Sequence, residues 1–333
     1  MDAAYCCYLL LLLLLLLLLL LRLQAPTNDD PRRACSNLPG AISKVAPLSS
    51  SASNVVPMAA PALTVSTAAV LHKGMPRGLR LDLQWADVTV DSSTPKCEGG
   101  YGQVSRVFWC GCAFALKQPK MKIVLTKRDL RNFVAEVQVQ GRVRHPCCVT
   151  IFGVCLQPDN PFILMEWVGG GTLFTKLGDE ELHPRQRLTC AREVASAVDC
   201  LHTSGIIHGD IKSLNVLLTA SGSAKLCDFG GAVQLLTSIA SSASAGGRNA
   251  STTLAWCAPE LLTGGSKSAA TDMYAFGILM WECYTQEVPF DRVSPSLIES
   301  HVKSGCRPTM PPAPIDGFPP DFVALMQVFA LLS

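Results

Sequence analysis

The stretch IIHGDIKSLNVLL, residues 206–218, places chemically active side chains between two apolar runs. Asp210, Lys212 and Asn215 lie close together in it. A carboxylate can accept a proton, a lysine can hold an anion, and an amide oxygen can bind a metal ion. These residue types in one loop are those expected of a centre for phosphoryl transfer, provided that the rest of the chain supplies the partners that such a loop needs.

A second candidate is Lys117, which ends the apolar stretch AFALK. Lysine is seldom buried without a partner, so an inward-facing lysine here requires an anion, whereas a lysine at a strand end could equally reach solvent. Glu136 could hold it, because the surrounding sequence RNFVAEVQVQGRVRH has apolar residues at a helical period. The alternative for Glu136 is a solvated carboxylate on a helix surface.

The sequence before Lys117, CEGGYGQVSRVFWCGCAFALK, predicts a strand, a glycine turn, a second strand and a third strand that ends in the lysine. Gly99, Gly100 and Gly102 could let the backbone lie close to phosphates, because a Cβ would hold it away. Hairpins rich in glycine are common, so this pattern alone indicates phosphate binding only weakly.

The order of these pieces resembles the signature of the protein kinase family: glycine loop, strand lysine, helix glutamate, catalytic loop, then DFG (228–230) and APE (258–260). The resemblance implies an α+β, two-lobed fold for a kinase domain at 81–333, with a small β-rich lobe at 85–167 and a larger, mainly helical lobe at 168–333. The stretches HGDIKSLNVLL, TDMYAFGILMWE and GCRPTMP are most similar to the tyrosine-kinase-like group, whose members mostly phosphorylate serine and threonine.

The resemblance also implies ATP and Mg²⁺ as cofactors and a role for each candidate residue. Asp210 would accept the proton of a substrate hydroxyl, Lys212 is typical of the Ser/Thr version of the loop, and Asn215 completes the catalytic set. Asn215 and Asp228 would bind the metal, and Thr253 would lie on the substrate side, beside Lys212 and Asp210. The implied ATP-binding residues are Cys97, Gly99, Gly100, Gly102, Val104, Ala115, Lys117, Glu136, Met165, Glu166 and Val168.

Among these, Lys117 would hold the α- and β-phosphates and Glu136 would orient it. Met165 would be the gatekeeper, and the backbone of residues 166–168 would form hydrogen bonds with adenine. An ordinary buried strand is the alternative for this stretch alone.

The implied partners are proteins with Ser/Thr hydroxyls. Nucleic acid is not expected, because 28 basic residues nearly balance 26 acidic ones. The 15 cysteines lack zinc-site or disulfide-scaffold spacing, so most are interpreted as reduced core residues of a cytosolic domain.

Three departures from the family pattern stand out. Gly209 replaces the arginine that usually pairs with a phosphate on the activation loop, so activity should not need phosphorylation of that loop. Cys97 replaces the first loop glycine, which predicts weaker ATP affinity and a thiol beside the nucleotide, or else an inert buried cysteine. The chain looks truncated at Ser333, before the final helices and the arginine that would pair with Glu260, which predicts a buried carboxylate without its cation. A catalytically weak or inactive kinase-fold scaffold that binds nucleotide and partners is therefore the alternative function.

The N-terminal segment, residues 1–23, contains an uninterrupted apolar run at 3–21. As a helix it would be roughly 28 Å long, about one hydrocarbon core, and the arginines that follow would place the rest of the chain in the cytoplasm. A signal peptide without the usual basic start, or a leucine repeat with no targeting role, are the alternatives. Residues 24–80 are rich in Ala, Ser and Pro and are predicted to be a disordered linker. The alternation in LRLDLQWADVTV then predicts a strand.

Overall fold

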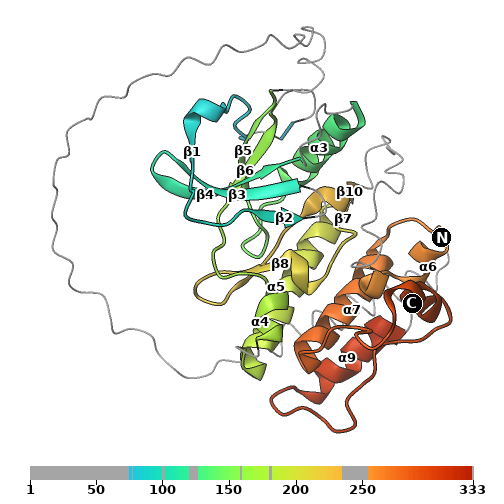
Figure 1. The fold of residues 1–333 in the computed structure, drawn as a ribbon. Helices are drawn as coiled ribbons and strands as arrows, with labels where there is room; N and C mark the ends of the chain where they lie inside the picture. The colour runs from blue at the N-terminus through green and yellow to red at the C-terminus, as the bar shows by residue number, and fades with distance from the viewer. Residues whose placement is uncertain are drawn as a thin grey trace, which may run out of the picture.

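The computed structural model describes residues 75–331, except for residue 77 and the ranges 100–101, 120–126, 158–159, 180–181 and 235–253. The described residues form a small lobe built on a sheet and a larger lobe built on helices (Figure 1). The predictions for the apolar segment and for the linker up to residue 74 lie outside them. Within this described part, no helix is long and apolar enough to cross a membrane.

The small lobe is a six-stranded antiparallel sheet with one long helix, α3, packed beside it (Figure 1). The strand order is β1-β3-β4-β6-β5, and the short β2 pairs with β3. The elements are β1 (Val88–Val90), β2 (Cys97–Gly99), β3 (Gly102–Trp109), β4 (Cys112–Gln118), α3 (Lys127–Gln140), β5 (Ile151–Cys155) and β6 (Phe162–Glu166).

Strand β4 shows how the sequence directs side chains to the two faces of this sheet. Successive side chains of a strand point to opposite faces. Ala115 belongs to the cluster that includes Phe133 and Val137 of α3. Leu116 belongs to a separate cluster with Val107 and residues of β6. Lys117, two residues after Ala115, is therefore directed to the side of the sheet that α3 covers.

The start of the ordered domain differs from the prediction. Composition predicts a linker up to residue 80, but Leu79 is buried and the backbone of Arg80 forms hydrogen bonds with Phe152 and Val154 of β5. Composition conceals this, because the packing contacts of this segment are made to a distant strand. The predicted strand in LRLDLQWADVTV is also wrong over most of its length, since only β1 is a strand and a 3₁₀ turn precedes it.

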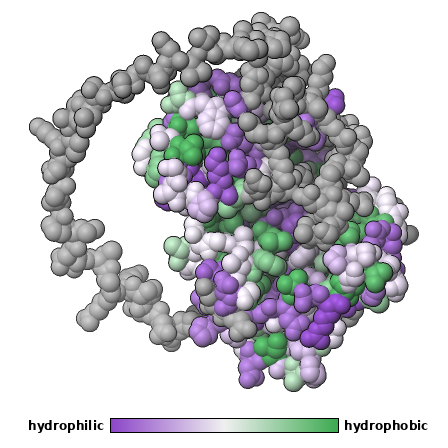
Figure 2. Space-filling model, viewed as in Figure 1, coloured by the Kyte–Doolittle hydropathy of each residue, from purple (hydrophilic) through white to green (hydrophobic). Residues whose placement is uncertain are grey.

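The larger lobe surrounds one buried helix, α7, which packs against α5 and α9 (Figure 1). Its helices are α4 (Leu173–Gly178), α5 (Pro184–Thr203), α6 (Pro259–Leu262), α7 (Ala269–Thr285), α8 (Pro295–Lys303) and α9 (Pro320–Leu331). Its short strands are β7 (Ile206–Ile207), β8 (Val216–Leu218), β9 (Ala224–Leu226) and β10 (Val233–Gln234), paired as β7 with β10 and β8 with β9. Figure 2 shows hydrophilic and hydrophobic residues intermixed over the visible face of both lobes.

The last helix, α9, has a packed apolar face. Phe322, Met326 and Phe329 are buried, and the ring of Phe329 lies 6.1 Å from that of Phe276 on α7. Glu260, on α6, is only partly buried. The expectation of a buried carboxylate there is wrong, because most of α6, Glu260 included, is partly exposed in the described structure.

Candidate active site

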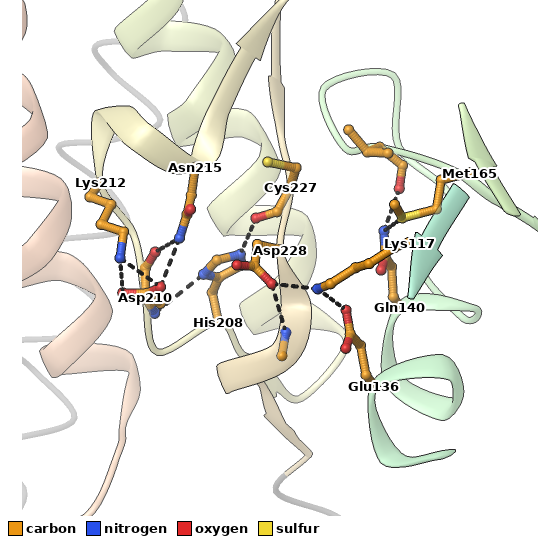
Figure 3. A network of polar contacts seen from close by, with 12 residues as sticks. Lys117, Glu136, Gln140, Met165, His208, Asp210, Lys212, Asn215, Cys227 and Asp228 are labelled. Carbon is orange, nitrogen blue, oxygen red and sulfur yellow. Dashed lines mark hydrogen bonds and ion pairs between the residues drawn. The ribbon is translucent and has the colours of Figure 1, made fainter. Parts of the chain in front are cut away.

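Lys117 is the centre of an ionic cluster between the two lobes (Figure 3). Its Nζ lies 2.6 Å from Oε1 of Glu136 on α3 and 2.7 Å from Oδ1 of Asp228, which follows β9. Lys117 is buried, and the side chain of Glu136 is only 10% exposed. Of the two alternatives that the sequence leaves open, the inward-facing lysine held by carboxylates is therefore correct.

The pKa values of Lys117 and Asp228 are set by burial and by the charges of the other residues in the cluster. Burial alone would lower the pKa of Lys117, but the carboxylates of Glu136 and Asp228 outweigh it and raise that pKa, so the lysine remains a cation. Burial would raise the pKa of Asp228, yet the ammonium of Lys117 holds it below its usual value. The site thus offers one fixed cation and an ionised carboxylate side by side.

The backbone at Asp228 is unusual, with φ 61° and ψ 77° in the left-handed region. A residue other than glycine rarely adopts this conformation, and such strain is found most often at functional sites. The neighbouring carbonyl, that of Cys227, accepts a hydrogen bond from His208 Nε2 at 3.1 Å. Burial lowers the pKa of His208, so the ring is neutral and joins the loop of Asp228 to the loop of Asp210 (Figure 3).

Asp210 is held by the two other polar residues of its own loop (Figure 3). Lys212 Nζ donates to both carboxylate oxygens of Asp210 at 2.9 Å. Asn215 Nδ2 donates to Oδ2 of Asp210 and to its backbone carbonyl, each at 2.8 Å. All three residues are buried. The loop therefore presents one carboxylate in a single orientation, beside a cation.

Two buried acidic residues of helix α7 accept hydrogen bonds from this loop. Asp272 accepts hydrogen bonds from the backbone N–H groups of His208 at 2.8 Å and of Gly209 at 2.7 Å. Glu282 accepts from the hydroxyl and backbone N–H of Ser213 and from Trp256 Nε1. Neither carboxylate was predicted from the sequence to have a role. The available signal was that they are the only charged residues in an otherwise apolar helix.

The glycine hairpin is formed by β2 and β3, and β3 pairs with β4, the strand that carries Lys117. Gly99 pairs with Gly102, and Cys97 pairs with Val104. A Cβ at Gly102 would overlap the carbonyl oxygen of Gln118, so close packing against β4 requires this glycine. Cys97 is exposed.

The predicted adenine side is formed by β4 and β6. Ala115 pairs with Met165 across the two strands, and both are buried. Val168 is buried, while Glu166 turns back to bind Lys225 at 2.9 Å. Behind Met165 lies Gln140 of α3, whose Nε2 donates to the carbonyl of Val149 and approaches Met165 Sδ at 4.0 Å (Figure 3). No local pattern in the sequence singles out Gln140.

Two predicted site residues, Gly100 and Thr253, lie outside the described residues. The polar candidates form two groups, Lys117 with Glu136 and Asp228, and Asp210 with Lys212 and Asn215. A divalent ion would find oxygen ligands here. The amide nitrogen of Asn215 is directed to Asp210, which leaves Asn215 Oδ1 as an acceptor, and Asp228 is an ionised carboxylate. Such hard oxygen donors fit Mg²⁺.

Comparisons with known proteins agree with this arrangement. Residues 97–311 match the protein kinase domain family. A probable serine/threonine-protein kinase of Dictyostelium discoideum is 31% identical over 236 residues, covering 70% of this chain and 25% of that protein. Serine/threonine-protein kinase CTR1 of Arabidopsis thaliana is 30% identical over 238 residues, covering 68% and 27%. Mitogen-activated protein kinase kinase kinase 7 of Bos taurus is 31% identical over 224 residues, covering 64% and 36%.

The matched part of the chain thus spans only a minor share of each relative's length. It includes both groups of site residues, from the glycine hairpin to the loop of Asp228. The two-lobed fold with a β-sheet in the small lobe and helices in the large one is the fold that the resemblance implied. This chain therefore belongs to the protein kinase family, and the relatives to which it is similar include serine/threonine-protein kinases.

Proposed function

We propose that this chain is an ATP- and Mg²⁺-dependent protein kinase that phosphorylates serine and threonine hydroxyls of other proteins. The observation that carries the proposal is the orientation of Asp210 by Lys212 and Asn215. A general base must be held within reach of the proton that it accepts, and a base with two fixed donors has lost its freedom to turn away.

Each residue of the site has a part in this reaction. Asp210 accepts the proton of the substrate hydroxyl, and Lys212 supplies positive charge next to it. Lys117, held by Glu136, binds the phosphates of the nucleotide. Asn215 and Asp228 hold Mg²⁺, which neutralises charge on the phosphates when bound. Selectivity for aliphatic hydroxyls rests on Lys212, which lies next to Asp210 as in the Ser/Thr version of the loop.

The place of action stays a prediction. A cytoplasmic kinase domain, anchored to a membrane through residues 3–21, is the expectation from the apolar run and the arginines after it. A fluorescent fusion of the full chain, compared with one that lacks residues 1–23, would test it by fractionation.

The proposal is tested by phosphate transfer from labelled ATP with the full chain. Generic protein substrates that offer either Ser/Thr or Tyr would be compared, and Asp210→Asn is the matched control, because it keeps the size of the side chain. We expect label on Ser/Thr that falls by about 10²- to 10⁴-fold in the variant, the usual contribution of a general base.

Two other results would overturn the proposal. Label confined to tyrosine would exclude the Ser/Thr assignment. A folded protein that binds Mg·ATP but transfers no label would favour the alternative, a kinase-fold scaffold that binds nucleotide and partners.

A further inference from the structure

Lys267, just before the start of α7, reaches across the loop of Asp210. Its Nζ donates a hydrogen bond of 2.6 Å to the backbone carbonyl of Gly231, in the short 3₁₀ helix that follows Asp228. The lysine is partly buried, although nothing in the sequence distinguishes it from a surface residue. It thereby connects the large-lobe helix α7 to the segment that carries a predicted metal ligand.

The space through which Lys267 passes is the space that Gly209 leaves open. A Cβ built on Gly209 would lie 2.5 Å from Cδ of Lys267 and 2.7 Å from its Nζ. Gly209 also has a backbone φ of +70°, a conformation that residues with side chains rarely adopt. A residue with a side chain at 209 would therefore displace the lysine, and the bond to Gly231 would break with it.

Two carboxylates act on the charge of Lys267 against the effect of its burial, although burial has the larger effect on the pKa of the lysine. Burial lowers its pKa, whereas the carboxylates of Asp210 and Asp272 act in the opposite direction. Asp272 is the residue that binds the backbone N–H groups of His208 and Gly209. The ammonium group thus lies in the field of the carboxylate proposed as the base and of the carboxylate that supports its loop.

We propose that Lys267 is a positioning residue that takes the place of the cation missing at position 209. From the start of α7 it fixes the segment after Asp228 against the loop of Asp210, so the two halves of the site keep their relative position through a bond internal to the fold. The inference rests on the proposed function, because it assigns Lys267 a part in the same reaction. Lys267 acts through Gly231 and is not itself assigned a contact with substrate.

The first test measures nucleotide binding, which does not depend on turnover. The affinity of the full chain for ADP would be measured with and without Mg²⁺ for wild type, Lys267→Met and Lys267→Arg. Lys303→Met is the matched control, since Lys303 pairs with Glu299 on the exposed face of α8. We expect Lys267→Met to lose most of the gain in ADP affinity that Mg²⁺ provides, while its affinity without metal stays within about threefold.

Lys267→Arg should restore part of that gain, because a guanidinium can also donate to the carbonyl of Gly231. Catalysis should follow the same order, with kcat of Lys267→Met reduced by about tenfold or more. A lysine that only stabilises the fold would lower the melting temperature and leave the Mg²⁺-dependent gain intact. That result would overturn the proposal.

The second test is a double-mutant cycle of Gly209→Ala and Lys267→Ala, read by urea unfolding. The backbone strain at position 209 is the same in both backgrounds and cancels. We expect Gly209→Ala to be less destabilising when Lys267 is already alanine, because the added methyl group no longer meets the lysine. Additive effects would refute the pairing. The cycle measures stability and needs no enzymatic activity. If the wild-type protein transferred no phosphate, the proposed function would be refuted, and the cycle would still test the contact between Lys267 and Gly209.

Discussion

Asn215 uses both hydrogens of its side-chain amide on Asp210, one on Oδ2 and one on the backbone carbonyl, each at 2.8 Å. The amide is thereby fixed in one orientation, with its oxygen left to accept. A residue implied as a metal ligand and the residue proposed as base are thus joined directly. A change in the position of Asn215 therefore also changes the position of Asp210. We expect small substitutions in this loop to alter both residues.

The first prediction concerns Lys212, which donates to both oxygens of Asp210. Lys212→Met should lower kcat by about 10²-fold, the usual effect of removing one stabilising donor from a reacting centre. KM for ATP should change far less, because Lys212 contacts the base and has no assigned contact with the nucleotide. Initial rates over a range of ATP concentrations would separate the two parameters. A rise in KM at constant kcat would instead place Lys212 in nucleotide binding.

The second prediction concerns Glu136, one of the two carboxylates that hold Lys117. Glu136→Gln keeps the length of the side chain and removes its charge, which leaves Asp228 as the counter-ion of Lys117. The lysine should then shift toward Asp228, and affinity for Mg·ADP should weaken by about tenfold, or about 1.4 kcal/mol. Titration calorimetry would measure it. Glu299→Gln, on the exposed face of α8, is the matched control, and an equal effect in both variants would contradict the prediction.

The third prediction uses Glu282, whose burial raises its pKa to about 7 from a usual value of 4.5, although bonds from Ser213 and Trp256 oppose the change. A carboxyl with a raised folded-state pKa keeps its proton longer in the folded than in the unfolded protein. Stability from this group is therefore complete below about pH 4.5 and is lost as the pH rises to about 7. A difference of one between the folded and unfolded pKa corresponds to about 1.4 kcal/mol, so the loss is about 3 kcal/mol.

Glu282→Gln should remove this pH dependence. An amide can accept from Trp256 with its oxygen and donate to the Ser213 hydroxyl with its nitrogen, so the hydrogen bonds can be kept. Free energies of unfolding in urea, at several pH values between about 4.5 and 8, would be compared for wild type and variant. Parallel curves would show that Glu282 does not titrate in this range.

The fourth prediction concerns Arg187 on α5, which caps the end of the buried helix α7. Its Nη1 donates to the carbonyls of Cys283 and Tyr284, at 2.8 and 2.9 Å, and its guanidinium lies 5.1 Å from the ring centre of Phe318. Arg187→Met would leave two carbonyls of the last helical turn without this donor and should cost about 2–3 kcal/mol of unfolding free energy. Lys303→Met on α8 should change it by less than about 0.5 kcal/mol. An equally small change for Arg187→Met would refute the prediction.

The composition of the ionic cluster could be predicted from the sequence because each member carries a local signal. Lys117 ends an apolar strand, Glu136 lies on a helix with an apolar face, and Asp228 begins the DFG triplet. The resemblance supplied their order, and the fold brings all three within hydrogen-bonding distance. Their roles with nucleotide and metal remain proposals.

The features that could not be predicted depend on contacts between distant segments. Leu79 and Arg80 fall within the predicted linker because their contacts are made to distant residues, those of the small-lobe core for Leu79 and those of β5 for Arg80. Gly209 in the sequence indicates only the loss of a cation, whereas the structure places Lys267 over that glycine. Composition and periodicity report on neighbours along a helix or strand, so neither could indicate that these two residues meet.

The close approach of Lys267 to Gly209 also restricts how the sequence can change over generations. Arginine at position 209 would meet the lysine side chain and would displace it from the carbonyl of Gly231 unless Lys267 had been replaced first. Replacing Lys267 first leaves a protein with a cation at neither position. A lineage that returns to the usual family pattern therefore changes two positions, and in either order the first change removes the contact between Lys267 and Gly231.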